Sequence, residues 1–316
     1  MTPESKDFSA HITEKTLVLP AIQAWKIFLR DQGRSNHTLK AFSADLLLLA
    51  KWLPTDKQIG QITTKDLEDF LTWLEKGRGI PCSPKTLSRR ITSLKSFFRW
   101  LAENAAIPSD PAKEIIQKTV LAPLPTALTR SEVEQALKAA EAIRTSAKSD
   151  PRPYVLLKLL LETALKKGEV LSLMTNHLEI ENTTEPYVYV RYPGTRSEYR
   201  YKERKLPVSM DWVEAYKDYA TLYEIKDQVF PWSQRRLEYL LEDITKAAKL
   251  EKHISFDMCR WTCVLNDLID GVETDHIRQK YGCSKIQWRE VHTKLRQLAK
   301  DQNYDLDRLP GFRKLD

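Results

Sequence analysis

The chain has 316 residues and carries 50 Lys and Arg against 43 Asp and Glu, which gives a formal net charge of +7. The length indicates two domains, and a hydrophobic content of 42% supports ordinary cores and excludes general disorder. Four cysteines are too few for a disulfide scaffold, and the sequence has neither a secretory leader nor an apolar run of about 18 residues. We therefore expect a cytoplasmic protein with no membrane partner, whose basic charge serves either solubility or an anionic partner.

The first third of the chain has the period of amphipathic helices. Apolar residues recur at steps of three and four from Leu39 to Leu53, and Thr63 is typical of the N-cap that precedes a helix. Ser83-Pro84 opens a longer helix, because proline in the first turn lacks only a donor that would have no helical acceptor. The expected helices cover residues 39–53, 64–74 and 85–101, and a short one holds Ile115 and Ile116.

A proline-rich segment divides the chain. Ala122-Pro-Leu-Pro-Thr126 contains two prolines in five residues, a composition that favours extended chain. We expect a helical domain over residues 1–121, a linker over 122–126, a second domain over 127–302 and a tail without clear period over 303–316.

The second domain mixes helices with a short β segment. Thr129 begins a capping signature, and residues 153–173 predict one Leu-rich helix. Residues 187–192 and 199–208 then alternate around a Pro193-Gly194 turn signal, which predicts a hairpin or small sheet, and residues 233–300 return to helical periodicity. The predicted fold class is mainly α, with a small β-hairpin in the C-terminal domain.

Basic residues concentrate in two stretches. Residues 83–118 hold seven basic and three acidic residues, and residues 191–205 hold six and two. On the helix over 85–101 the cations lie opposite the apolar stripe, with Ser and Thr hydroxyls between them, an arrangement that suits a phosphate backbone; a solvated helix face is the alternative. The candidate nucleic-acid contacts are Lys85, Arg89, Lys95, Arg99, Arg196, Arg200, Lys202, Arg204, Arg235 and Arg236.

Seven short segments in a fixed order resemble one protein family. They are Ser35-Asn-His-Thr-Leu-Lys40, the stretch 83–101, Pro108-Ser-Asp-Pro-Ala112, Thr163-Ala-Leu-Lys-Lys-Gly-Glu169, Lys202-Glu-Arg-Lys-Leu-Pro207, Asp257-Met-Cys-Arg-Trp-Thr262 and Tyr281-Gly-Cys283. In this order and spacing, over roughly residues 15–300, they resemble the tyrosine recombinases, which include phage integrases and Xer-like chromosome-dimer resolvases.

The resemblance implies a two-domain clamp around duplex DNA. Residues 1–121 would be a SAM-like core-binding domain, and residues 127–302 a catalytic-type domain. In this family a tyrosine attacks the scissile phosphate and forms a 3′-phosphotyrosyl link without a metal, while arginines, a hairpin lysine and His or Trp side chains stabilise the charged transition state. The resemblance therefore implies no cofactor, and it allows the C-terminal segment to dock on a second copy or on an active recombinase.

The positions that carry the chemistry depart from the family pattern. Lys166 stands at the first arginine position, and Arg260 keeps the second. Lys202 is the best match to the hairpin lysine, although Arg196 or Arg200 could lie nearer the phosphate. Both Lys166 and Arg260 are also candidate DNA contacts. The remaining positions of the catalytic set hold Asp257, Cys283 and, nine residues later where the nucleophile is expected, His292.

Asp257 is the most damaging of these departures. A carboxylate about 4 Å from a phosphate repels it by roughly 4 kcal/mol at an effective dielectric constant near 20. Asp257 could instead pair with Arg260 one helical turn along. Such a pair would neutralise the positive charge of the one catalytic arginine that the sequence keeps.

These residues predict a double-stranded DNA-binding pseudoenzyme with a tyrosine-recombinase fold. Its role would be architectural, regulatory or accessory in recombination or in a mobile element. One alternative is an active recombinase with a different nucleophile, either His292 or Tyr304 from the tail. A second alternative is a protein-interaction module that has lost DNA binding.

A zinc site and a nucleotide cofactor have less support in the sequence. Cys259 and Cys263 are four residues apart on a predicted helix, with His253, His276 and Cys283 near in sequence, but no CxxC element supports a zinc site. With nine glycines and no phosphate-loop motif, a nucleotide cofactor is not expected either. Trp261 and Trp288 are interpreted as core residues rather than as platforms for stacked bases.

Overall fold

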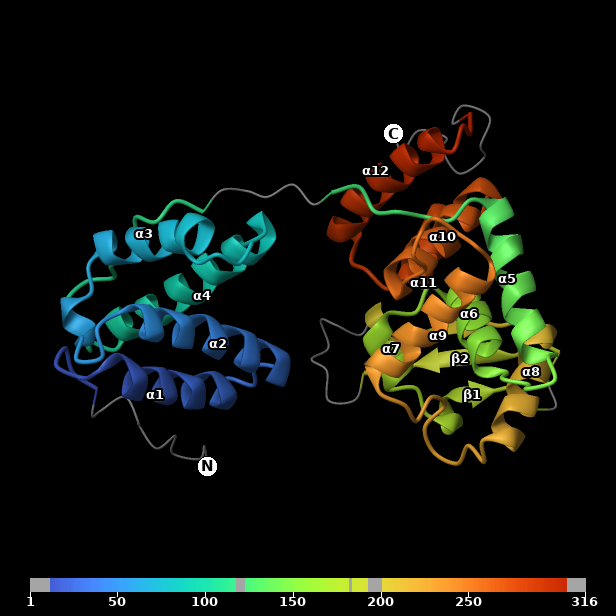
Figure 1. Ribbon diagram of the computed structural model, residues 1–316, viewed down its shortest axis with the longest axis horizontal. Helices are drawn as coiled ribbons and strands as arrows, with labels where there is room; N and C mark the ends of the chain where they lie inside the picture. The colour runs from blue at the N-terminus through green and yellow to red at the C-terminus, as the bar shows by residue number, and fades with distance from the viewer. Residues whose placement is uncertain (1–11, 118–122, 182–183, 193–200, 306–316) are drawn as a thin grey trace. The chain divides into compact units, whose positions relative to one another are not determined.

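The computed structural model describes residues 12–117, 123–181, 184–192 and 201–305 (Figure 1). The chain divides into two compact units, Met1–Ala122 and Pro123–Asp316, which we call the N-terminal and C-terminal units. The division falls at the start of the predicted linker. Within the described residues, every helix is too short or too polar to cross a membrane.

Over its described residues, 12–117, the N-terminal unit is a group of four α-helices around an aromatic core. Trp25 is fully buried; its ring lies parallel to that of Phe42 and edge-on to that of Phe97. The three long helices expected from periodicity are confirmed, whereas α1 was not foreseen. The helices are α1 (Val18–Asp31), α2 (Asn36–Trp52), α3 (Thr64–Thr72), which a π-helical turn extends over Trp73–Gly77, and α4 (Pro84–Glu103); a 3-10 turn covers Ile59–Gln61.

The short helix expected around Ile115 and Ile116 is wrong. Turns followed by extended chain occupy this segment, in which Ile115 is buried and Ile116 is 82% exposed. The Asp110 carboxylate accepts a bond from the Ala112 N–H, a local turn that competes with helix formation. The segment then lies along α4, where the Gln117 side-chain amide donates to three oxygens of Ser88 and Thr92, each at 2.9 Å.

A buried carboxylate joins α2 to α4. Asp45 accepts hydrogen bonds from Arg89 and, at 2.8 Å, from the Ser93 hydroxyl, and Arg90 lies 3.7 Å away. Arg89 also donates to the Ala41 carbonyl at 3.3 Å. The Arg89 guanidinium is therefore held by Asp45, although the side chain stays 40% exposed. It is only partly withdrawn from the solvent face of α4 that the helical pattern predicted.

The C-terminal unit surrounds a largely apolar core with eight helices and a small sheet, among the described residues (Figure 1). Trp212 of α8 is fully buried and donates its indole N–H to the Val155 carbonyl of α6 at 3.0 Å. The helices are α5 (Arg130–Arg144), α6 (Arg152–Thr163), α7 (Lys167–Leu171), α8 (Met210–Leu222), α9 (Gln234–Ala247), α10 (Phe256–Ile269), α11 (Thr274–Tyr281) and α12 (Lys285–Asp301).

The single helix expected over residues 153–173 is two helices. The chain breaks at Ala164, which adopts a left-handed conformation with φ of 52° at the end of α6. Lys166 then caps α7, and the Glu169 side chain accepts the Lys166 backbone N–H at 2.8 Å. This break changes the direction of the chain and places Lys166 and Glu169 on a separate short element.

The hairpin prediction is confirmed for its strands. β2 (Tyr187–Val190) pairs antiparallel with β3 (Arg204–Pro207), and Val188 faces Leu206 across the pair. Both of these side chains are buried, as alternation requires of a sheet with one face on the core. β1 (Leu178–Glu179), which was not foreseen, adds a third strand after a 3-10 turn. The candidates Arg196 and Arg200 lie outside the described residues.

We predict that Asp45→Ala destabilises the N-terminal unit by about 3 kcal/mol, because it leaves Arg89 and Arg90 partly buried without their shared carboxylate. Scanning calorimetry of the full chain should show the transition of this unit shifted down by roughly 10 °C or more. Asp69→Ala is the matched control, since the Lys65–Asp69 pair is exposed and such pairs contribute only about 0.5 kcal/mol. Equal shifts for the two variants would contradict the prediction.

Candidate nucleic-acid interface

A buried ion pair organises the centre of the C-terminal unit. Arg204 of β3 donates to both carboxylate oxygens of Glu169 of α7, at 3.0 and 2.8 Å. Both side chains are about 5% exposed or less. Arg204 also donates through Nε to the Lys280 carbonyl of α11 at 2.8 Å. One guanidinium therefore fixes three elements that are far apart in the sequence.

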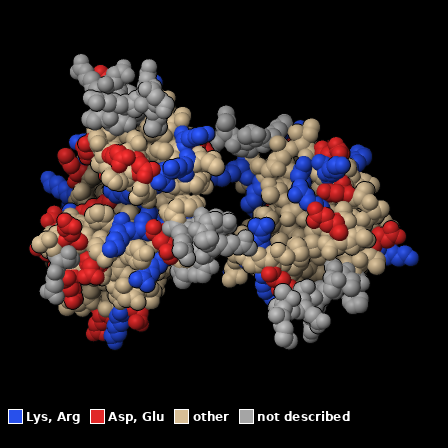
Figure 2. Space-filling view, turned by 180° about the vertical axis from the view of Figure 1, so that it is seen from behind, with Lys and Arg blue, Asp and Glu red and all other residues tan. Residues whose placement is uncertain are grey.

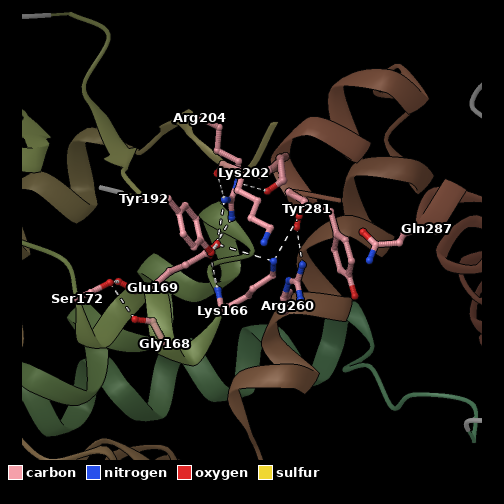
Figure 3. Close-up of polar contacts among 12 residues, drawn as sticks. Lys166, Gly168, Glu169, Ser172, Tyr192, Lys202, Arg204, Arg260, Tyr281 and Gln287 are labelled. Carbon is pink, nitrogen blue, oxygen red and sulfur yellow. Dashed lines mark hydrogen bonds and ion pairs between the residues drawn. The ribbon is translucent and has the colours of Figure 1, made fainter. Parts of the chain in front are cut away.

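Glu169 accepts further bonds around this pair (Figure 3). The Tyr192 hydroxyl donates to it at 2.6 Å, in addition to the Lys166 backbone N–H. Burial alone would raise the pKa of Glu169, but the hydrogen bonds and charge of Arg204, together with these donors, hold it below its ordinary value. Glu169 is thus a buried carboxylate that stays ionised.

Gly282 allows Arg204 to approach the end of α11. A Cβ built on Gly282 would lie 2.8 Å from Arg204 Nη1, and the glycine has φ of 66°, a conformation that side chains rarely adopt. Residue 282 therefore has no room for a larger residue. Tyr281 and Cys283 flank Gly282 in this turn.

Arg260, the arginine kept from the family pattern, is held by Tyr281. Its guanidinium carbon lies 3.5 Å from the centroid of the Tyr281 ring, and Nη2 donates to the Tyr281 carbonyl. The residue is 9% exposed, and this burial lowers its pKa. The Arg260 guanidinium thus contacts both the ring and the backbone carbonyl of Tyr281.

Lys166 lies next to Arg260 and is more open to solvent. Its ammonium donates to the Gly282 carbonyl at 3.3 Å and is 4.0 Å from a Glu169 oxygen. Burial and the positive charge of Arg260 lower the pKa of Lys166 to about 8. Near this pH the amine therefore exchanges between its charged and neutral forms.

Three cations converge at this point. The Lys202 side chain extends from the turn before β3 toward Lys166 and Arg260 (Figure 3), and its ammonium lies 5.6 Å from the Tyr192 ring centroid. Lys166 and Arg260 line an open cavity of about 850 Å³ and a second of about 300 Å³. Lys202 lines neither cavity but lies beside the two residues that do. Positive charge gathered from three elements is typical of an anion site.

The larger cavity contains further cationic residues on α9 and α7. Arg235 is exposed, lines the cavity and donates through Nε to the Tyr239 hydroxyl at 2.8 Å, whereas Arg236 is half-buried. Lys167 also lines it and pairs with Glu238 at 2.9 Å. Lys167 and His253 of this cavity were not foreseen; Lys167 follows Lys166 directly, but no sequence signal pointed to His253.

Asp257 does not pair with Arg260, so that expectation is wrong. Asp257 is exposed in the first turn of α10 and lines the larger cavity. Among the ion pairs of the described residues, none joins the two side chains. The reason is that Arg260 turns toward the carbonyl at the end of α11, away from its own helix.

The other departures from the family pattern lie on α12 or next to it. Cys283 is buried and lines the smaller cavity. His292 is half-buried on α12, with its ring 5.8 Å from that of Trp288, and burial lowers its pKa. His292 does not line either cavity. Tyr304 packs against the core beside α12, and its hydroxyl interacts with Arg130.

In the N-terminal unit, a shallow pocket of about 360 Å³ joins α4 to the start of α2. Lys95 and Arg99 line it with the hydroxyl residues Thr92 and Ser96, as the helical pattern predicted. Arg34, which precedes α2, was missed because it lies apart from the basic stretches. Lys85 is exposed at the start of α4.

Arg204 is removed from the candidate DNA contacts by its burial, and Arg89 is partly withdrawn by Asp45. Figure 2 shows acidic side chains interspersed with basic ones over the face in view. The surface does not carry a single sign of charge there. Local convergence of cations, rather than the overall charge of +7, therefore marks the candidate interface.

Cys259 and Cys263 lie inside the core, where burial raises the pKa of the Cys263 thiol to about 12. Among the described residues there is no group of three or more His, Cys, Asp or Glu side chains arranged to hold a metal ion. The interpretation of Trp261 and Trp288 as core residues is confirmed, since both are buried in one apolar cluster.

Family comparison agrees with this geometry. The phage integrase N-terminal SAM-like domain matches residues 22–104, and the phage integrase family matches residues 126–296, more than half of the chain. The chain belongs to the phage integrase family. The resemblance inferred from short segments is thereby confirmed, as are the mainly helical fold class and its small sheet.

The relatives and solved structures have low sequence identity to this chain, but the matches cover most of its length. The chain is 26% identical over 271 residues to "Tyrosine recombinase XerC" of Xanthomonas campestris pv. campestris (strain B100), covering 83% of this chain and 79% of that protein. It is 22% identical to "Tyrosine recombinase XerD" of Listeria innocua serovar 6a, covering 85% and 91%.

Among solved structures, a lambda integrase tetramer bound to a Holliday junction superposes with a TM-score of 0.67 at 14% identity, covering 96% of this chain and 81% of that one. XerH bound to its difH substrate superposes with a TM-score of 0.64 at 18% identity, covering 90% and 84%. At these identities the superpositions establish the fold.

We predict that Glu169→Gln destabilises the C-terminal unit by about 3 kcal/mol at neutral pH, because the buried Arg204 loses its counter-charge. Since the pKa of Glu169 is lowered in the folded protein, its stabilising contribution is present above the ordinary value of 4.5 and is lost as pH falls through the lowered value. The difference in unfolding free energy between wild type and variant should therefore shrink in acid.

Chemical denaturation over a pH series measures this difference. Glu290→Gln is the control, because Glu290 is exposed in its pair with Lys294 and its loss should change stability by less than about 1 kcal/mol. A difference for Glu169→Gln that does not depend on pH would contradict the assignment.

Proposed function

We propose that this member of the phage integrase family binds duplex DNA without cutting it, in an architectural, regulatory or accessory role in recombination or mobile-element biology. The observation that carries the proposal is the composition of one site. Lys166, Lys202 and Arg260 provide converging positive charge, while Asp257 brings a negative charge to the same cavity. Charge suited to holding a phosphate is kept where the groups suited to breaking its ester are replaced.

DNA binding is supported by cations in each unit taken separately. The N-terminal unit presents Lys95, Arg99 and Arg34 around one pocket, and the C-terminal unit presents the three converging cations with Arg235 nearby. Lysine and arginine contacts to phosphates fix register and supply affinity without reading bases. Solved relatives include a lambda integrase tetramer bound to a Holliday junction and XerH bound to difH.

Loss of cleavage is supported by the donors at the site. A developing oxyanion needs preorganised donors, and a guanidinium supplies two at a fixed separation. Lys166 provides only a point charge. Arg204 cannot replace the missing arginine, because Glu169 and the Lys280 carbonyl occupy its N–H groups. Cys283 is a weak donor at neutral pH.

The nucleophile is the second part of this argument. Nine residues after Cys283, where the family resemblance implies the attacking tyrosine, the chain has His292, which does not line the cavities shared by Lys166 and Arg260. Tyr304 is engaged with Arg130 beside α12. Neither His292 nor Tyr304 lines the cavities that Lys166 and Arg260 share, which favours loss of cleavage over a substitute nucleophile.

Association with a second recombinase chain is part of the proposal. Solved relatives are described as a dimer and a tetramer of lambda integrase on DNA. We propose that this chain likewise assembles on DNA, with another copy of itself or with an active recombinase, through its C-terminal segment. The tail that would make this contact lies mostly outside the described residues.

We predict salt-sensitive binding of duplex DNA in gel-shift titrations, with the logarithm of affinity falling linearly with the logarithm of salt concentration. The double variant Lys95→Glu/Arg99→Glu should bind about tenfold or more weakly and reduce this salt dependence, because each phosphate contact contributes about 0.9 to the slope.

Lys65→Glu on α3 provides a charge-reversal control at an exposed position outside the pocket, with half the change in net charge. It should leave affinity within a factor of about two. If both variants bind as wild type does, the N-terminal unit does not hold DNA through α4.

We further predict that restoring the family residues restores strand cleavage. The variant Lys166→Arg/Asp257→His/Cys283→His/His292→Tyr should gain slow relaxation of supercoiled plasmid, because it regains the nucleophile and the donors that activate the phosphate. The same variant with His292 retained is the control and should stay inactive. Relaxation by the wild-type protein would contradict the proposal.

A further inference from the structure

The Lys166 amine is a reactive group that phosphate binding alone does not use. Lys166 lines both open cavities of the C-terminal unit and its side chain is 35% exposed, while the Glu169 oxygen that faces its ammonium is 4.0 Å away. Lys167, the next residue, pairs with Glu238 at 2.9 Å. Two adjacent lysines at one cavity thus differ in environment, and only the first is accessible without a close counter-ion.

The surroundings of Lys166 favour its neutral, nucleophilic form. Burial and the charge of Arg260 lower its pKa to about 8, whereas Lys158, Lys246 and Lys280 of the described residues have raised pKa values. A lysine amine becomes a nucleophile when burial or a neighbouring cation disfavours its protonated form. The titratable and charged groups that face it are Glu169 on its own helix, Arg260 of α10, Lys202 and Arg204 at β3, and Cys283 after α11.

The chemistry of DNA limits what this amine could attack. Intact duplex offers phosphate esters, which the proposed function only binds, and no carbonyl carbon on its sugars. An abasic site differs, because its deoxyribose opens to expose an aldehyde at C1′. Amines of lysine react with carbonyl carbons to form Schiff bases. Arg260, which lines the same cavity as Lys166, would hold the backbone phosphate next to such a sugar.

We propose that Lys166 forms a Schiff base with the C1′ aldehyde of abasic sites in duplex DNA. This inference rests on the proposed DNA binding. The lone pair of the neutral Lys166 Nζ forms a bond to the C1′ carbon, the two N–H protons pass to the carbonyl oxygen, which leaves as water, and a C=N double bond remains. No oxidant or reductant takes part. The family's arginine could not act in this way, because a guanidinium stays protonated and is not a nucleophile.

The test is reductive trapping on the full chain. A labelled duplex with one central abasic site is incubated with saturating protein and sodium cyanoborohydride, which converts the imine to a stable amine. Denaturing gels give the trapped fraction, and gel shifts under the same conditions give the bound fraction. Dividing one by the other removes differences in affinity between variants. Peptide mapping by mass spectrometry then locates the modified lysine.

Wild type is expected to give an adduct at Lys166 that is absent with intact duplex. Lys166→Arg, which keeps the positive charge, should lower the trapped fraction per bound complex by about tenfold or more. Lys246→Arg, at an exposed position of α9 that lines neither cavity, should leave it within a factor of about two. The wild-type trapping rate should rise from about pH 6.5 to about pH 8.5, since the neutral amine is the reacting form.

Three outcomes would overturn the proposal. Binding of abasic duplex without an adduct would exclude the Schiff base while leaving the proposed function intact. Mapping of the adduct to Lys167, Lys202 or another lysine would assign the chemistry elsewhere. Failure to bind either duplex would overturn the proposed function, and this inference with it. Calorimetry of Lys166→Arg confirms that the variant is folded before its loss of trapping is counted.

Discussion

The buried pair of Glu169 and Arg204 determines the geometry of the C-terminal unit around its cations. Glu169 lies on α7, which begins at Lys166, and Arg204 lies on β3, two residues beyond Lys202. The same guanidinium binds the Lys280 carbonyl at the end of α11, beside the turn that presents Tyr281 to Arg260. Lys166 and Lys202 thus lie next to elements that this pair joins, and Arg260 of α10 contacts the turn at the end of α11. A buried pair of this kind is costly to break from one side, because the remaining charge has no solvent to stabilise it.

The same arrangement decides which cations can meet a ligand. Arg204 is buried and bound to Glu169, and Tyr281 covers much of Arg260. The two guanidinium groups therefore act mainly to hold the unit together. Lys166 and Lys202 are the more accessible charges. A lysine attracts a phosphate as a point charge and does not impose the two-point geometry of an arginine. A site of this composition is suited to holding a DNA backbone. With Asp257 in the same cavity, it is poorly suited to stabilising additional negative charge on phosphorus.

Much of the fold follows from local patterns in the sequence. The elements that were not predicted correctly have physical causes. Helices α2, α3 and α4 have apolar periodicity and Ser or Thr N-caps. All three helices were predicted from the sequence. The helix α1 begins at Val18 without a side-chain cap, so no start signal marked it. The break at Ala164 was missed because alanine is a strong helix former, and its left-handed conformation is imposed by tertiary packing.

The candidate site shows the same division between local and distant information. The segments that resemble the family located Lys166, Lys202 and Arg260, and the structure brings these together. Arg89 and Arg204 were expected to face DNA, but each is held by a carboxylate that lies 44 or 35 positions away in the sequence. A helical or strand pattern shows which side of an element a residue lies on, and it does not show the buried partner that a distant segment supplies. Asp45 and Glu169 are those partners.

The most direct test of the central claim is an assay on a nicked suicide substrate that scores bound and covalently attached DNA for the same wild-type sample. In such a substrate the cleaved strand loses a short fragment, so any phosphotyrosyl or phosphohistidyl intermediate accumulates. The account predicts that the duplex is bound in a salt-sensitive manner and that no covalent protein–DNA species forms. A covalent species that depends on His292 or Tyr304 would contradict it.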